Sequence, residues 1–135
     1  MIPHSHPILT LHTRHVANPN QLLAVFLHEQ IHWFLASPAN RDAQEAALYQ
    51  LREIYPRVPH SRDGGAADED STYLHLLVNW LEFDALSQLL GIDKAREVVQ
   101  GKDVYEWIYG EVIKDNQELE SIVNRHGLKI ANEHR

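Results

Sequence analysis

The sequence predicts one mainly helical domain with minimal strand content. Its 135 residues suffice for a single hydrophobic core but not for two, so we expect one domain over 1–135 with no internal boundary. Apolar residues recur at helical spacing along most of the chain, and asparagine, proline and glycine bound the segments that show this spacing. Only residues 8–13 have the β-branched character of a strand.

The N-terminal part is expected to contribute little to the core. Residues 1–7 contain two prolines and two histidines and are expected to form a loose arm. We interpret His4 and His6 there as exposed side chains rather than as ligands. Residues 8–13 are expected to form one short strand, because a proline precedes them and a polar turn follows.

The first long helix is expected from Pro19 to about Ala36. Asn18 is suited to cap its N-terminus, and proline is favoured at the first helical position. The helix should stop before Pro38, which cannot continue it. Because this segment is apolar over most of its length, we expect the helix to be buried.

Two further helices are expected on either side of a long loop. Residues 40–55 show an apolar stripe that ends at a proline, and residues 72–90 show a second stripe that ends at Gly91. Between them, residues 57–70 show no periodicity and contain a glycine pair and an acidic run. A loop of this length in a small domain is either a binding segment or structureless, and the sequence does not separate the two.

The C-terminal third is expected to be helical as well. Glycines and possible caps divide it into three shorter helices, at 93–100, at 104–114 with Asp103 as its possible cap, and at 117–126. Tyr105, Trp107 and Tyr109 are interpreted as core and helix-packing residues rather than as a binding box, although a tyrosine hydroxyl near a metal stays open.

Composition and charge exclude several classes of function. There are 12 lysines and arginines against 19 acidic residues, a net charge of −7, with no basic cluster, which disfavours binding to nucleic acid or to an anionic membrane. The absence of cysteine excludes disulfides, thiolate metal ligands and a cysteine nucleophile. No signal peptide or membrane-spanning run is recognisable, so we expect a cytoplasmic protein.

The most informative stretch lies within the first helix and reads H-E-x-x-H. On a helix, His28 and His32 lie one turn apart and present two imidazoles to one point. Neutral imidazole is a good zinc ligand, and a catalytic zinc has three protein ligands and one open position. The carboxylate of Glu29 beside them is suited to take a proton from an attacking water. The motif therefore predicts a Zn²⁺ site.

The pattern can also be interpreted without a metal. The chain has 10 histidines, so the pattern arises by chance in a few per cent of such sequences. Two histidines and a glutamate in an otherwise apolar helix would, however, be costly to bury without a partner such as a metal. We therefore favour the metal site over satisfied or solvent-facing polar residues.

A third ligand must come from another segment, and the 72–90 helix offers the best candidates. His75, Asn79 and Glu82 fall at i, i+4 and i+7, along one face. Glu82 is preferred as the ligand, because a carboxylate on an apolar helix needs a reason. His75 is the second candidate; if Glu82 binds the metal, His75 is placed to steady an oxyanion or substrate as a catalytic residue. The remaining candidates are Glu45, Glu53 and Asp84.

These residues together resemble the zincin metallopeptidases, and most nearly the very small, minigluzincin-like members of the gluzincin branch. The resemblance covers two helices. It implies a compact helical zincin-like domain in which His28, His32 and Glu82 bind zinc and Glu29 acts as general base and acid. It also implies a metallopeptidase, a hydrolase that acts on peptide or protein substrates.

Two alternatives stay open. The segment from Glu29 to His32 also matches the E-x-x-H pair of di-iron helical bundles, but no second such pair follows in a core helix. A peptidase-like domain can also serve as a protein-interaction module that holds a metal without catalysis. The sequence gives neither the substrate nor the oligomeric state.

Overall fold

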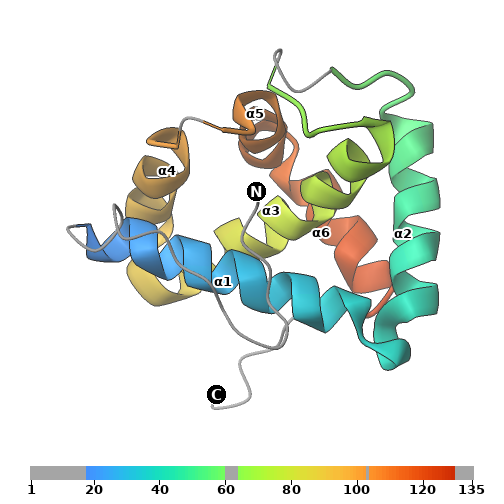
Figure 1. The fold of residues 1–135 in the computed structure, drawn as a ribbon, viewed down its shortest axis with the longest axis horizontal. Helices are drawn as coiled ribbons and strands as arrows, with labels where there is room; N and C mark the ends of the chain where they lie inside the picture. The colour runs from blue at the N-terminus through green and yellow to red at the C-terminus, as the bar shows by residue number, and fades with distance from the viewer. Residues whose placement is uncertain (1–17, 60–63, 103, 130–135) are drawn as a thin grey trace.

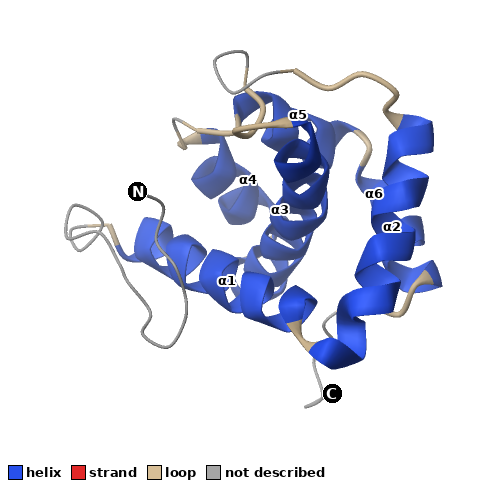
Figure 2. Cartoon of the chain, turned by 45° about the vertical axis from the view of Figure 1, so that its right-hand side comes forward, coloured by secondary structure: helices blue, strands red, loops and turns tan. Residues whose placement is uncertain are grey.

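The computed structural model describes residues 18–59, 64–102 and 104–129, and every regular element within these ranges is a helix (Figure 2). The expected arm, the expected strand at 8–13 and the possible cap at position 103 lie outside the described residues. The prediction of a mainly helical chain is confirmed. The elements are α1 (Pro19–Ala36), the 3₁₀ turn η2 (Pro38–Asn40), α2 (Arg41–Ile54), α3 (Glu69–Leu90), α4 (Ile92–Gln100), α5 (Glu106–Lys114) and α6 (Asn116–Arg125).

Helix α3 is the central element of the fold. It contacts each of the five other α-helices, which surround it (Figure 1). Every residue from His75 to Phe83 is buried, so this part of the helix is covered on all sides rather than along one stripe. Any polar side chain in this part of α3 is therefore surrounded by protein, and His75, Asn79 and Glu82 are three of them.

The observed helix ends follow the local capping chemistry. The Asn18 side chain accepts a hydrogen bond from the Gln21 amide, and Pro19 begins α1, as expected. Helix α3 begins three residues earlier than expected, because the Asp68 carboxylate caps it through the Ser71 amide at 2.7 Å. The acidic run in the preceding loop is thus partly the first turn of a helix, where negative charge is favoured.

The loop before α3 is fixed to the start of α5 by Gly64. Its carbonyl accepts a hydrogen bond from the Trp107 amide at 3.1 Å, and its φ angle of +95° is one that side-chain-bearing residues rarely adopt. A Cβ at this position would lie 2.6 Å from the Trp107 nitrogen. The close approach therefore requires glycine.

We expect Gly64→Ala to destabilise the protein by about 1–3 kcal/mol, because the methyl group meets the backbone and the φ angle is strained. Urea unfolding measures this change. Gly110→Ala is the control: Gly110 lies inside α5, a Cβ there meets nothing within 4 Å, and alanine favours helix. The control should be neutral or stabilising, and equal destabilisation by both changes would contradict the account.

Candidate metal centre

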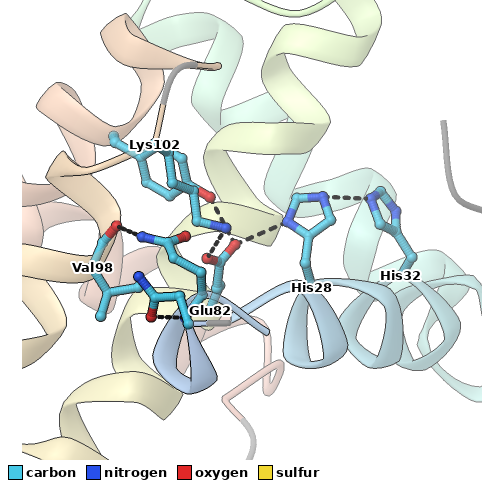
Figure 3. Close-up of polar contacts among 8 residues, drawn as sticks. His28, His32, Glu82, Val98 and Lys102 are labelled. Atoms are coloured by element: carbon cyan, nitrogen blue, oxygen red, sulfur yellow. Dashed lines mark hydrogen bonds and ion pairs between the residues drawn. The ribbon is translucent and has the colours of Figure 1, made fainter. Parts of the chain in front are cut away.

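Two imidazole rings of α1 meet on one side of that helix. His28 and His32 lie four residues apart, so their side chains leave the helix in nearly the same direction. Their Nε2 atoms are 3.3 Å apart, and their ring centroids are 4.9 Å apart (Figure 3). Two ring nitrogens at this distance either share a proton or face a common cation, because two lone pairs repel each other. The two rings therefore present two possible metal-ligand nitrogens to one point.

A third ring comes from α3. His75 is 6 % exposed, and its centroid lies 5.4 Å from that of His28 and 5.1 Å from that of His32. Ligand atoms of the three rings all lie within 4.8 Å of one another. The Nδ1 of His75 is 2.8 Å from the Ser71 carbonyl oxygen, which can only accept a hydrogen bond. Nδ1 therefore carries the ring proton, and the Nε2 lone pair is left for a ligand.

Glu82 lies behind His28 rather than among the three rings. Its Oε1 accepts a hydrogen bond from Nδ1 of His28 at 2.9 Å and another from the Tyr109 hydroxyl at 2.8 Å. Its Oε2 forms an ion pair with the Lys102 ammonium at 3.3 Å (Figure 3). Because a carboxylate accepts, the His28 proton sits on Nδ1, and its Nε2 is free to face His32.

The charge of Glu82 is stabilised within the core. Complete burial alone would raise the pKa of its carboxyl group, but the Lys102 ammonium, the His28 hydrogen bond and the Tyr109 hydroxyl outweigh burial and hold the pKa below its usual value. The carboxylate in turn raises the pKa of Tyr109 well above its usual value, with burial as the larger cause. Glu82 is therefore ionised at neutral pH and Tyr109 is protonated.

Tyr105 covers one side of the ring cluster. Its ring stacks on His75 with centroids 4.6 Å apart and lies parallel to His28 at 6.1 Å. It caps α5 with a φ angle of 57°, in the left-handed region that residues other than glycine rarely adopt. Burial, and then the charges of Glu82 and Glu29, raise the pKa of the Tyr105 hydroxyl. Glu29, itself 5 % exposed, therefore lies close enough to the Tyr105 hydroxyl to influence its pKa.

Both His32 and His75 are uncharged at neutral pH. Burial, followed by the neighbouring His28, lowers the pKa of His32 from 6.5 to about 3. The same two causes lower the pKa of His75 from 6.5 to about 4. Neutral rings are the form that binds a metal, so the core keeps both side chains ready for coordination at ordinary pH.

These shifts predict how the stability of the metal-free protein depends on pH. The two rings take up protons near pH 6.5 when unfolded but only near pH 3 to 4 when folded, so the unfolded state binds more protons in between. Stability is therefore full above pH 6.5 and falls as the pH drops toward 4. Urea midpoints at pH 7.5, 6 and 5 measure this decline. His75→Phe should flatten it, whereas an unchanged pH dependence in that variant would contradict the assignment.

The donor set fits zinc. In the described part of the chain, the clustered ligand atoms are all imidazole nitrogens. Such a set suits a single zinc ion, whereas paired irons are bound at sites rich in carboxylates. Asn79 lies between His75 and Glu82 on the same face of α3 and is fully buried, yet its amide makes no hydrogen bond to a described residue. An unpaired buried amide costs about 1–3 kcal/mol. Such a cost is tolerated at a site that binds a polar ligand.

The structure thus brings the candidate ligands of α1 and α3 close together, but it exchanges the positions expected for His75 and Glu82. It places His75, the second candidate for third ligand, with His28 and His32, and it places the preferred candidate, Glu82, on the far nitrogen of His28. The Tyr109 hydroxyl contacts Glu82, and a tyrosine hydroxyl beside the metal stays a prediction. Lys102 was missed, because a lysine just after the glycine that ends α4 follows no recognisable pattern.

Comparison with protein-family models, with curated proteins and with solved structures finds no match to the chain. No described helix is long and apolar enough to cross a membrane. The function must therefore be argued from the residues and their geometry.

Proposed function

We propose that the protein is a zinc-dependent hydrolase, most simply a metallopeptidase, with zinc held by His28, His32 and His75. The observation that carries the proposal is the convergence of three imidazoles from α1 and α3, with ligand atoms within 4.8 Å of one another. In two of them Nδ1 is engaged, by Glu82 or by the Ser71 carbonyl, so that Nε2 is the nitrogen without a proton. Ligand histidines in zinc proteins are commonly held in this way.

The proposal assigns the third ligand to His75 instead of Glu82. Both oxygens of Glu82 already have partners, and its contact with His28 is made to Nδ1, the nitrogen that carries the proton. As a ligand, His75 no longer serves as the oxyanion donor considered from the sequence. The site differs in this respect from the gluzincin pattern, in which the third ligand is a glutamate.

Glu29 is the catalytic residue of the proposal. A zinc ion at such a site lowers the pKa of water and polarises a carbonyl group. In this proposal the Glu29 carboxylate, which follows the first ligand directly in H-E-x-x-H, accepts the proton of the attacking water and returns it to the leaving nitrogen. The Tyr105 ring, stacked on His75, forms a wall beside which a peptide substrate would bind.

Two measurements on purified protein test the proposal. Elemental analysis should give about one zinc per chain after dialysis against trace zinc, and the zinc-loaded protein should cleave members of a peptide library detected by mass spectrometry. A protein that holds zinc but cleaves no peptide would be a metal-binding or interaction domain without catalysis. A protein that holds no zinc would refute the proposal altogether.

A further inference from the structure

Residues from three parts of the chain meet at the Glu82 carboxylate, which itself contacts Nδ1 of His28. Glu82 belongs to α3, Tyr109 to α5, and Lys102 follows the end of α4. The side chain of Glu82 is completely buried and that of Lys102 is 11 % exposed. The Gln21 side chain of α1 donates a hydrogen bond to the Val98 carbonyl of α4 at 2.9 Å, which joins the helix of His28 to the helix that precedes Lys102 (Figure 3).

Stability alone does not account for this arrangement. Removing a carboxylate and an ammonium from water costs several kcal/mol for each ion, and apolar residues of similar size often stabilise a fold at least as well as a buried ion pair. The residues on either side of Glu82 in α3, Leu81 and Phe83, are core side chains, so the helix at this level is otherwise apolar. A buried pair that touches a functional histidine therefore calls for a functional reason.

We propose that Glu82, Lys102 and Tyr109 form a positioning unit that fixes the orientation and tautomer of His28. The inference rests on the proposed function. Glu82 holds the ring proton on Nδ1 through the 2.9 Å hydrogen bond, so the Nε2 lone pair faces His32 and His75. Lys102 and Tyr109 hold the two carboxylate oxygens in place, and both therefore act on His28 through Glu82.

The same contacts explain why Glu82 stays outside the ring cluster. With Oε1 shared between His28 and Tyr109, and Oε2 paired with Lys102, rotation of the carboxylate toward the free nitrogens would break all three interactions. Lys102 and Tyr109 thus help to keep Glu82 a partner of a ligand rather than a ligand itself.

The experiment compares zinc affinity and histidine tautomers in Glu82→Leu, Lys102→Met and the double variant. In the double variant both charges are removed together, so no unpaired ion stays in the core. We expect a loss of zinc affinity of about ten- to a hundredfold, which is typical when partners of metal-binding histidines are removed. Nitrogen-15 NMR of the metal-free protein should show the His28 proton on Nδ1 in the wild type and no such preference in the double variant.

Controls separate positioning from a general effect of charge. Lys94→Met removes an exposed lysine of α4 that pairs with Glu97 at 3.4 Å, and it should change neither readout. Because Lys102 acts through Glu82, Lys102→Met should have little further effect once Glu82 is leucine. If the double variant unfolds, Tyr109→Phe, which removes one hydroxyl, provides the same test with a smaller expected loss.

The outcomes distinguish this inference from the proposed function. If the wild type binds zinc and the folded variants bind it equally tightly with an unchanged His28 tautomer, the positioning unit is refuted and the metal centre stands. If the wild type binds no zinc, the metal centre fails, and the positioning unit loses its role with it.

Discussion

The His75→Ala variant is expected to lose more than about a hundredfold in zinc affinity. Zinc sites built from protein side chains contribute roughly 10 kcal/mol or more at neutral pH, so one ligand of three accounts for about 3 kcal/mol, or somewhat more than a factor of a hundred. Competition titration with a chromophoric chelator measures the affinity. Far-ultraviolet circular dichroism confirms that the variant is folded.

Two comparison variants make this result decisive. His126→Ala removes a partly buried histidine outside the ring cluster, whose Nε2 forms a hydrogen bond with the Gln50 side chain at 2.9 Å. This variant should leave zinc affinity unchanged. Glu82→Gln should weaken binding less than His75→Ala does, because Glu82 acts on a ligand and not on the metal. The opposite order, with His75→Ala close to wild type and Glu82→Gln unable to bind, would restore Glu82 as the third ligand.

The Glu29→Gln variant is expected to keep its zinc and to lose peptide hydrolysis by about a factor of 10²–10⁴. Glutamine preserves the shape of the side chain but cannot accept the proton of the attacking water, and proton transfer by a placed side chain contributes rate enhancements of this size. The measurements are zinc content and the initial rate of peptide cleavage on the same preparation.

Cleavage by a contaminating protease would be unaffected by this substitution, so a loss of activity in Glu29→Gln assigns the cleavage to this chain. Glu53→Gln, at an exposed position on α2, is the matched control and should retain full activity. Loss of zinc from Glu29→Gln would show that the carboxylate is needed for metal binding, and undiminished hydrolysis would remove its role as general base.

The sequence was sufficient for the parts of the site that lie within one helix. Asn18 and Pro19 mark the start of α1, and the four-residue spacing of His28 and His32 sets their common direction whatever the rest of the fold does. The polar stripe of α3 was also recognisable, because its side chains repeat at helical spacing within an apolar segment. Local periodicity predicts these features because it depends only on nearby residues.

The choice between His75 and Glu82 could not be made in this way. The two lie seven residues apart on one face, so either can approach α1, and the packing of the two helices decides which one meets the free nitrogens. In the structure α3 passes α1 in the opposite direction: Glu82 meets His28, whereas His75 lies at the level of both motif rings. Lys102 and Tyr105 lie outside the interiors of α4 and α5, where the sequence offers no periodic signal.

The most direct test of the three-histidine centre is an anomalous difference map, at the zinc absorption edge, from crystals of the zinc-loaded protein. The account predicts one peak about 2.0–2.1 Å from a ring nitrogen of each of His28, His32 and His75, the usual zinc–imidazole distance, with Glu82 bonded to Nδ1 of His28. A peak bound by His28, His32 and a Glu82 oxygen, or no peak among these rings, would contradict it.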